Sequence, residues 1–266
     1  MQKKEFQNKI WAYYHTHKRT LPWRQTRDPY KILVSEIMLQ QTQAPRVIPK
    51  YKTFIKEFPD AEALAHAPLK KVLTLWQGLG YNRRAIYLKR CAEIIVRDHK
   101  GKFPKDVKTL LSLPGIGQAT AGDILAFAFN IPTVVIETNI RTVFLYQFFK
   151  EKDKVSDTEI IPLIKATLDM QNPREWYWAL FDYGAHLKET HKINHKSTHY
   201  KKQSSFRGSH REKRATLLRA ILSGKHSKDT LTQLLSYDLK LVDKITRELT
   251  QEGFICVNRA GIFRAK

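Results

Sequence analysis

Cysteine is scarce in this chain of 266 residues. Cys91 and Cys256 are the only two, and they form no paired motif. A disulfide framework or a thiolate metal site needs grouped cysteines, so we expect neither, and we interpret both thiols as buried apolar fillers. Long apolar runs are also missing: none approaches the roughly 20 residues of a spanning helix, and the N-terminal MQKKEFQNKI lacks a signal-peptide core. We therefore expect a cytoplasmic protein with no membrane segment.

Acidic residues are few relative to basic ones. The chain has 47 lysines and arginines against 25 aspartates and glutamates, a net charge of +22. This excess is far above what solubility requires and is typical of proteins with a polyanionic partner. Nucleic acid is the first candidate, and a membrane surface is the second.

The pattern of apolar residues predicts a helical protein. From Glu5 to about Leu187, apolar positions recur every three or four residues and are interrupted at prolines and glycines. Between His186 and Arg214 the character changes to nine lysines or arginines, five histidines and two glutamates, with almost no aliphatic residues. This composition predicts an exposed linker or a DNA-facing loop.

The C-terminal region shows three short helical patterns, near 212–223, 227–235 and 239–252, followed by two apolar runs around an Asn-Arg-Ala-Gly turn. Three helices and a hairpin indicate a small winged-helix-like module. A helical cap with a frayed hairpin fits the pattern equally well.

The first specific motif is the hairpin LPGIGQATAG, which begins at Leu113. Two glycines between two helices present backbone N–H groups and a helix N-terminus to a phosphate. Taken alone, the motif is equally consistent with a plain tight helix connection.

The second motif places Glu36 in ILVSEIMLQQTQ. On a helix, its neighbours one turn away are Ile32, Leu33, Leu39 and Gln40, which predicts a mostly apolar environment for the carboxyl group. Such burial raises the pKa of a carboxyl group and makes it a candidate general acid. A glutamate on the solvent face is the alternative.

The third motif is VVIETNIR, in which an apolar run stops at Glu137 and a helix is expected to start near Thr138 or Asn139. A carboxylate at a helix start is favoured by the helix dipole, so Glu137 is interpreted either as a helix cap or as an ionised acid that faces a cationic sugar.

The series LPWR, DPY, ILVSEIMLQQTQ, RVIPKY, LWQGLGY and LPGIGQATAG resembles the adenine DNA glycosylases (MutY-like) of the helix-hairpin-helix superfamily, which also contains endonuclease III. The resemblance covers residues 5 to about 187. It implies that Glu36 protonates the flipped adenine at N7, that Glu137 occupies the position of an aspartate that stabilises the oxocarbenium-like sugar, and that Asn139 lies next to this acid.

The resemblance also implies DNA contacts. Gln40 and Gln41 match residues that reach into the helix stack, and Tyr81 matches a tyrosine that wedges beside the oxidised guanine. The candidate phosphate contacts are in the hairpin and the basic linker: Leu113, Gly115, Gly117, Gln118, Ala119, Lys201, Lys202 and Arg207. Ala119 stands where relatives that also cut the backbone have a lysine nucleophile, so a monofunctional glycosylase is expected.

Three departures from the family pattern stand out. Glu137 is one methylene longer than the family's aspartate, which moves the carboxylate by roughly 1.5 Å. The four cysteines of the family's iron-sulfur cluster are missing, and the four histidines of that region do not replace them at metal-ligand spacing: His186, His191, His195 and His199. No Nudix-like domain follows in the sequence.

We therefore predict a mainly α, two-lobed helix-hairpin-helix glycosylase fold at residues 1–187, a basic linker at 188–211 and a winged-helix-like module at 212–266. The expected function is excision of adenine opposite 8-oxoguanine or guanine by a monomer bound to double-stranded DNA in the nucleoid. No metal or cofactor is expected, although relatives often hold a structural monovalent cation at the hairpin. A thymine or uracil mismatch glycosylase and a non-catalytic DNA-lesion binder are the alternatives.

Overall fold

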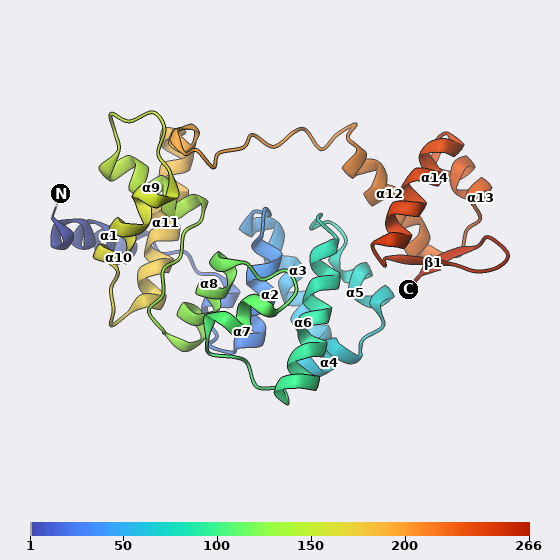
Figure 1. Cartoon of the computed structure of the whole chain (residues 1–266), viewed down its shortest axis with the longest axis horizontal. Coiled ribbons are helices and arrows are strands. Elements are labelled where there is room, and N and C mark those ends of the chain that lie inside the picture. Colours follow the sequence, from blue (N-terminus) through green and yellow to red (C-terminus); the bar gives the residue numbers. More distant parts are fainter. Residues whose placement is uncertain (1) are drawn as a thin grey trace. The chain divides into compact units, whose positions relative to one another are not determined.

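A computed structural model describes residues 2–266 and is mainly helical, as predicted (Figure 1). The α-helices are α1 Lys3–His17, α2 Pro29–Leu39, α3 Ala44–Glu57, α4 Ala61–His66, α5 Leu69–Trp76, α6 Arg83–His99, α7 Val107–Ser112, α8 Gln118–Phe129, α9 Thr138–Phe148, α10 Asp157–Thr167, α11 Pro173–His191, α12 His210–Ser223, α13 Lys228–Leu235 and α14 Leu239–Gln251. Two 3₁₀ turns, η1 Pro22–Arg24 and η2 Ile193–Lys196, and two strands, β1 Ile255–Val257 and β2 Phe263–Ala265, complete the described elements.

The chain forms two compact units. The first comprises the residues up to 36 together with 103–202, and the second comprises 37–102 together with 203–266. The predicted boundaries at 187/188 and 211/212 remain predictions. Among residues 2–266, no helix is both long and apolar enough to cross a membrane.

The core of the first unit is aromatic. Helices α9 and α11 lie side by side, and α1 packs against α11 (Figure 1). Phe6 of α1 is fully buried, with its ring centroid 5.3 Å from that of Phe144 and 5.9 Å from that of Trp176. Aromatic rings bury large apolar areas and stabilise one another edge-on, so this cluster fixes the scaffold around α8 and α9.

The LPWR motif has a clear structural role in the same unit. Arg24 donates to both oxygens of Asp182 in α11 at 2.8 Å, and Arg19 donates to Asp182 as well. Although burial opposes ionisation, the hydrogen bonds from Arg24 and Arg19 hold the pKa of Asp182 below its usual value. A bidentate ion pair therefore anchors the segment before α2.

The C-terminal part of the second unit contains the three helices and the hairpin that the sequence predicts. Helix α14 buries Val242, Ile245 and Leu249 at helical spacing. β1 and β2 pair antiparallel around the turn at Asn258–Gly261. These elements match the winged-helix-like pattern in order and length.

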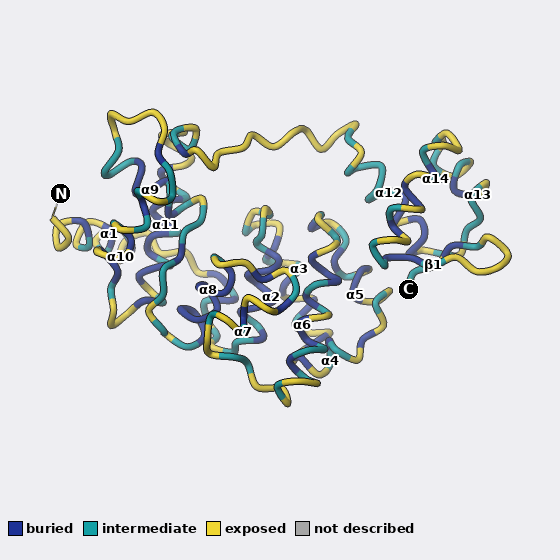
Figure 2. Tube along the Cα trace, viewed as in Figure 1, coloured by how far each residue is buried: buried dark blue, intermediate teal, exposed yellow. Residues whose placement is uncertain are grey.

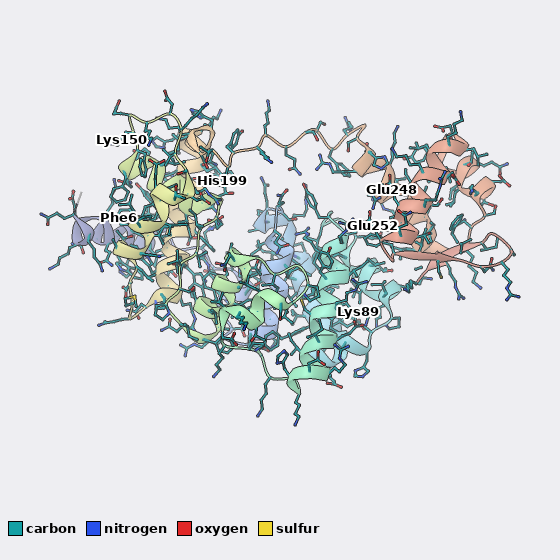
Figure 3. All side chains as sticks on the ribbon, in the orientation of Figure 1. Phe6, Lys89, Lys150, His199, Glu248 and Glu252 are labelled. Atoms are coloured by element: carbon teal, nitrogen blue, oxygen red, sulfur yellow. The ribbon has the colours of Figure 1, made fainter. Side chains whose placement is uncertain are left out.

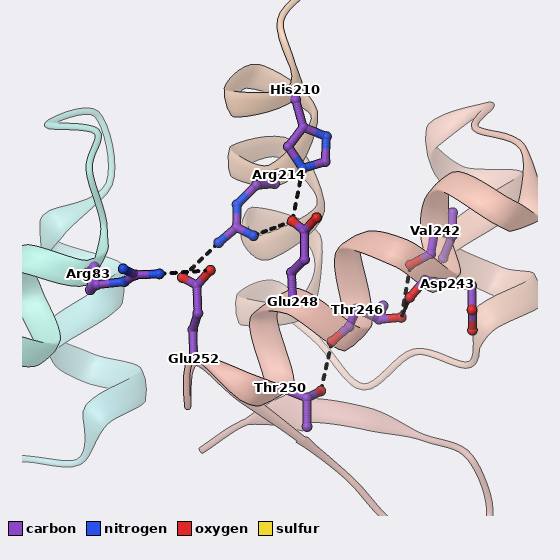
Figure 4. A network of polar contacts seen from close by, with 9 residues as sticks. All are labelled: Arg83, His210, Arg214, Val242, Asp243, Thr246, Glu248, Thr250 and Glu252. Carbon is purple, nitrogen blue, oxygen red and sulfur yellow. Dashed lines mark hydrogen bonds and ion pairs between the residues drawn. The ribbon is translucent and has the colours of Figure 1, made fainter.

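An ion-pair network ties α12 to α14 and reaches α6 (Figure 4). Arg83 of α6 lies 3.1 Å from Glu252, which follows α14 and also pairs with Arg214 of α12 at 2.9 Å. Arg214 also contacts Glu248, whose carboxylate lies 2.9 Å from His210. Glu248 and Glu252 are one turn apart (Figure 3). Within the second unit, this network links the C-terminal module to the start of α6.

Two local expectations were wrong. Helix α11 continues to His191, four residues beyond the predicted end, because Lys188, Glu189 and Thr190 extend it on a solvent-exposed turn that has no apolar periodicity. The exposed segment is therefore shorter than expected and runs over residues 198–208 (Figure 2). Cys91 is buried as predicted, but Cys256 is only half-buried and accepts a hydrogen bond from Arg264.

Candidate active site

Glu36 lies in the last turns of α2 and is buried, with 8% of its surface exposed. The Ser35 hydroxyl donates to its carboxyl group at 3.4 Å. Burial raises the pKa of Glu36 to about 8, against the lowering effects of Ser35 and the charge of Arg24, and the negative charge of Glu137 raises it further. Near neutral pH this carboxyl group is therefore protonated, as a general acid must be.

Glu137 caps the N-terminus of α9, which begins at Thr138 as the sequence predicts. Its carboxylate accepts the backbone N–H of Ile140 at 2.8 Å and the side-chain amide of Asn139 at 3.2 Å. Burial raises the pKa of Glu137 above its usual value, because it outweighs the lowering effects of hydrogen bonds from Asn139 and Ile140 and of the positive charges of Arg141 and Lys188. The helix N-terminus and the two donors nevertheless favour its ionised form.

A third acid, Asp123 in α8, interacts electrostatically with both glutamates. It is 6% exposed, and burial together with the charges of Glu36 and Glu137 raises its pKa well above the usual value. The first unit thus brings together three carboxyl groups, of which the sequence analysis identified two. The lone acid in the otherwise apolar run AGDILAFAF was the available signal.

The predicted hairpin connects α7 to α8. Leu113 is buried at the end of α7, Gly115 has a positive φ of 76°, and Gly117 is the N-cap of α8 in extended conformation. Because Gly117 has no side chain to cap the helix, the first turn of α8 presents backbone N–H groups beside the exposed Gln118. This is the local geometry of an anion site at a helix N-terminus.

In the second unit, Arg84 organises the turn after α2 and the loop before α6. Its guanidinium donates to the carbonyls of Ile37 and Met38 at 2.9 Å and to that of Gly80 at 3.0 Å. It also donates to the Gln40 carbonyl. Burial lowers the pKa of Arg84 to about 10, which leaves it charged near neutral pH. The cation therefore holds Gln40 and the Tyr81 loop together by their backbone.

The candidate stack-inserting residues sit on strained backbone at these two turns. Gln41 has φ 54° and Tyr81 has φ 47°, both in the left-handed region that non-glycine residues rarely adopt. Tyr81 is 40% exposed, and the guanidinium carbon of Arg84 lies 5.5 Å from its ring centroid. Gln41 is also exposed, so both side chains project from rigidly held turns.

The basic linker reaches Tyr81 within the second unit. Arg211 donates to the Tyr81 hydroxyl at 3.2 Å, and Gln203 donates to it as well. Arg211 is itself held by the Ser204 carbonyl at 2.7 Å. Lys201, Lys202 and Arg207 are exposed.

Comparison with known proteins agrees with this geometry. Residues 34–161 match the family model described as HhH-GPD superfamily base excision DNA repair protein. They belong to the HhH-GPD superfamily. The adenine DNA glycosylase of Buchnera aphidicola subsp. Baizongia pistaciae is 39% identical over 174 residues, 65% of this chain and 50% of that protein. The Mycobacterium tuberculosis enzyme of the same name is 43% identical over 133 residues, 50% of this chain and 44% of the relative.

Solved structures share the fold over most of the chain. A thermostable thymine-DNA glycosylase superposes with a TM-score of 0.61 at 27% identity, over 69% of this chain and 86% of that one. Endonuclease III in a trapped complex with DNA shares the fold, with a TM-score of 0.58 at 17% identity, over 77% of this chain and 91% of that one. The chain spans about half the length of the curated relatives it matches.

The residues of this chain do not fit the iron-sulfur cluster of the resembled family. Thiolates are the ligands of such clusters, and neither cysteine lies near the end of α11. The four histidines have different partners. His186 stacks on Tyr13, and His191 meets the ring of Tyr146 edge-on. His195 bonds the Lys192 carbonyl, and His199 approaches Asp157. Within residues 2–266, no three His, Cys, Asp or Glu side chains come together as a metal site.

Backbone hydrogen bonds hold the segment after α11 in place. The N–H of Val155 donates to the Lys196 carbonyl at 2.9 Å, and the N–H of Thr198 donates back to Val155 at 3.0 Å. The ammonium of Lys196 donates to the Lys150 carbonyl at 2.6 Å. Direct hydrogen bonds therefore order the chain after α11.

Proposed function

We propose that this chain is a monofunctional DNA glycosylase that excises adenine mispaired with 8-oxoguanine or guanine. The observation that carries the proposal is the pair of acids in opposite states: Glu36 is buried and protonated near pH 7, whereas Glu137 is held as an anion by a helix N-terminus and two donors. Glycosidic cleavage requires this combination of a proton donor and an anion.

The chemistry follows from these two states. The extruded adenine takes the Glu36 proton at N7, so the electron pair of the C1′–N9 bond leaves with a neutral base rather than an anion. Positive charge then develops at the sugar, where the Glu137 carboxylate stabilises it. Water adds to C1′ and loses a proton, which completes hydrolysis. Base flipping is needed because the bond and N7 are not both accessible within the stack.

Glu137 stands for the aspartate of the family, and Asn139 is its positioning residue. The amide of Asn139 and the N–H of Ile140 fix the two carboxylate oxygens, which supports a role for the longer side chain in the same reaction. Ala119 carries no amine, so no Schiff base forms there and the enzyme lacks lyase activity.

DNA contacts come from several elements. Gln40, Gln41 and Tyr81 enter the stack from turns held by Arg84. The hairpin contacts a phosphate through Leu113, Gly115, Gly117, Gln118 and Ala119, with a structural monovalent cation at its carbonyls. Lys201, Lys202 and Arg207 contact further phosphates, as their exposure supports.

We further propose that the enzyme works as a monomer in the cytoplasmic nucleoid and without an iron-sulfur cluster. The absence of cysteines from residues 192–255 and the hydrogen bonds that order residues 193–198 support independence from a cluster.

A thymine or uracil mismatch glycosylase is the second candidate, supported by the fold similarity to a thymine-DNA glycosylase. An acid directed at N7 favours a purine substrate, since pyrimidines lack that atom. A non-catalytic lesion binder is the third candidate.

Single-turnover assays on 8-oxoguanine:A, G:A, G:T and G:U duplexes test the proposal, with wild type compared against Glu36→Gln and Glu137→Ala. We expect adenine release by wild type only, with no borohydride-trapped covalent adduct. Release of thymine or uracil alone would establish the second candidate. Tight binding to mismatched DNA without any base release would establish the third.

A further inference from the structure

Asp123 is a buried acid that the mechanism above does not use. It lies one turn after Ala119 on the same face of α8, and its Oδ1 atom has no hydrogen-bond partner among the described residues. A buried ionised carboxylate without a cation is strongly unfavourable. The carboxyl group of Asp123 is therefore neutral in the folded protein.

The groups that act on Asp123 through charge give its Oδ1 atom no hydrogen bond. Glu36 from α2 and Glu137 from the start of α9 are both acids, and they act on Asp123 only through charge. Tyr177 of α11 is also near, but its hydroxyl donates to the Thr133 carbonyl and accepts from the Val135 N–H, so its proton is already used.

Like charges this close do not all ionise together. Glu137 has hydrogen-bond donors and a helix N-terminus, so it ionises first. Burial and the negative charge of Glu137 raise the pKa of Glu36 to about 8, and burial with the charges of Glu36 and Glu137 raises that of Asp123 well above its usual value. Near pH 7 the cluster holds one anion and two neutral acids.

We propose that Asp123 is a third carboxyl group of the catalytic site and binds the extruded adenine through a donor–acceptor pair. A neutral carboxyl group offers one O–H donor beside one carbonyl acceptor. Adenine presents a matching edge, since its 6-amino group donates next to a ring nitrogen that accepts. This inference rests on the proposed function and adds a residue that selects the base.

The test compares adenine with purine, which lacks only the 6-amino group, as the target opposite 8-oxoguanine. We expect wild type to release adenine faster than purine. Asp123→Ala should slow adenine release at least tenfold and purine release much less, so the adenine-to-purine ratio collapses. Asp123→Asn, which also offers a donor beside an acceptor, should restore the ratio. Asp98→Asn, at an exposed acid of α6, is the matched control and should leave the ratio unchanged.

The outcomes separate this inference from the proposed function. Adenine release by wild type with an unchanged ratio in Asp123→Ala overturns the inference alone. Failure of wild type to release adenine from any duplex overturns both. If Asp123→Ala does not fold, the midpoint of thermal unfolding decides: the wild-type value should fall relative to Asp123→Asn as pH rises from 5 to 8, and a constant difference contradicts a neutral Asp123.

Discussion

Arg84 lies over the ring of Tyr81, with its guanidinium carbon 5.5 Å from the ring centroid, and the same cation lies 5.4 Å from the ring of Trp76. Its N–H groups donate hydrogen bonds to backbone carbonyls at the end of α2 and in the loop before Tyr81. Arg84 is thus the positioning residue of two turns that we propose enter DNA.

Arg84→Lys should therefore be far from conservative. A lysine cannot satisfy the same set of buried carbonyls, so we expect a loss of about 2–4 kcal/mol in unfolding free energy. Urea unfolding measures it. Arg90→Lys, at an exposed position of the same helix, is the control and should lie within about 0.5 kcal/mol of wild type. Equal stability of the two variants would contradict the role of Arg84.

Two substitutions at Glu137 should distinguish its role as a helix cap from its role in catalysis. Glu137→Gln keeps one acceptor oxygen for the Ile140 N–H but removes the charge, whereas Glu137→Ala also removes the cap, at a cost of about 1 kcal/mol. We expect both variants to lose adenine release by at least about 100-fold and only the alanine variant to lose the cap contribution. Thermal unfolding and single-turnover rates provide the two readouts. A Gln variant as active as wild type would show that the charge at 137 is not needed.

Glu36 should make stability depend on pH. Its folded pKa of about 8 lies above the unfolded value near 4.5, so its contribution is fully present below pH 4.5 and is lost as pH rises toward 8. The unfolding free energy of wild type should fall relative to Glu36→Gln by up to ~1.4 kcal/mol per pH unit in this window. Parallel curves for the two proteins would mean that Glu36 is not buried as a neutral acid.

Arg211 should influence which base opposite the target is preferred. It holds the hydroxyl of Tyr81, and an arginine beside that wedge can donate to guanine O6 and N7. We expect Arg211→Ala to change the ratio of adenine release opposite 8-oxoguanine and opposite guanine by at least threefold. Arg219→Ala, at an exposed position of the same helix, should leave the ratio unchanged. If both variants behave alike, the contact with Tyr81 has no role in recognition.

The basic side chains of the linker should bind DNA independently of its base sequence. Lys201→Ala, Lys202→Ala and Arg207→Ala are expected to weaken binding to every duplex alike. Each variant should also reduce the slope of log affinity against log salt by about 0.9, measured by fluorescence anisotropy. A changed lesion preference in these variants would contradict their assignment as phosphate contacts.

Local chemistry made much of this structure predictable. Apolar neighbours at helical spacing correctly indicated that Glu36 is buried, and the end of an apolar run correctly placed the start of α9 after Glu137. The glycines of the hairpin and of the Asn258–Gly261 turn correctly indicated connections between elements. Such turns need a positive φ, which a glycine adopts easily, so a single residue predicts them.

Interactions between distant segments were not predictable. Arg84 looks like an ordinary helix cation in sequence, because several of its partners are backbone carbonyls more than 40 residues away that carry no side-chain signature. The extension of α11 to His191 was missed because an exposed turn has no apolar periodicity. Asp123 left a visible signal, a single acid in a buried apolar helix, but its proximity to two other acids depends on the tertiary fold.

The cap at α9 has a consequence for how related chains are compared. Glu137 satisfies a backbone donor of the fold, so a descendant that had abandoned catalysis would still benefit from keeping it. Glu36 caps no helix, and its burial disfavours the ionised form of its side chain. Among diverged copies of this gene, loss of Glu36 with retention of Glu137 would therefore be the expected trace of an enzyme that has stopped cutting bases.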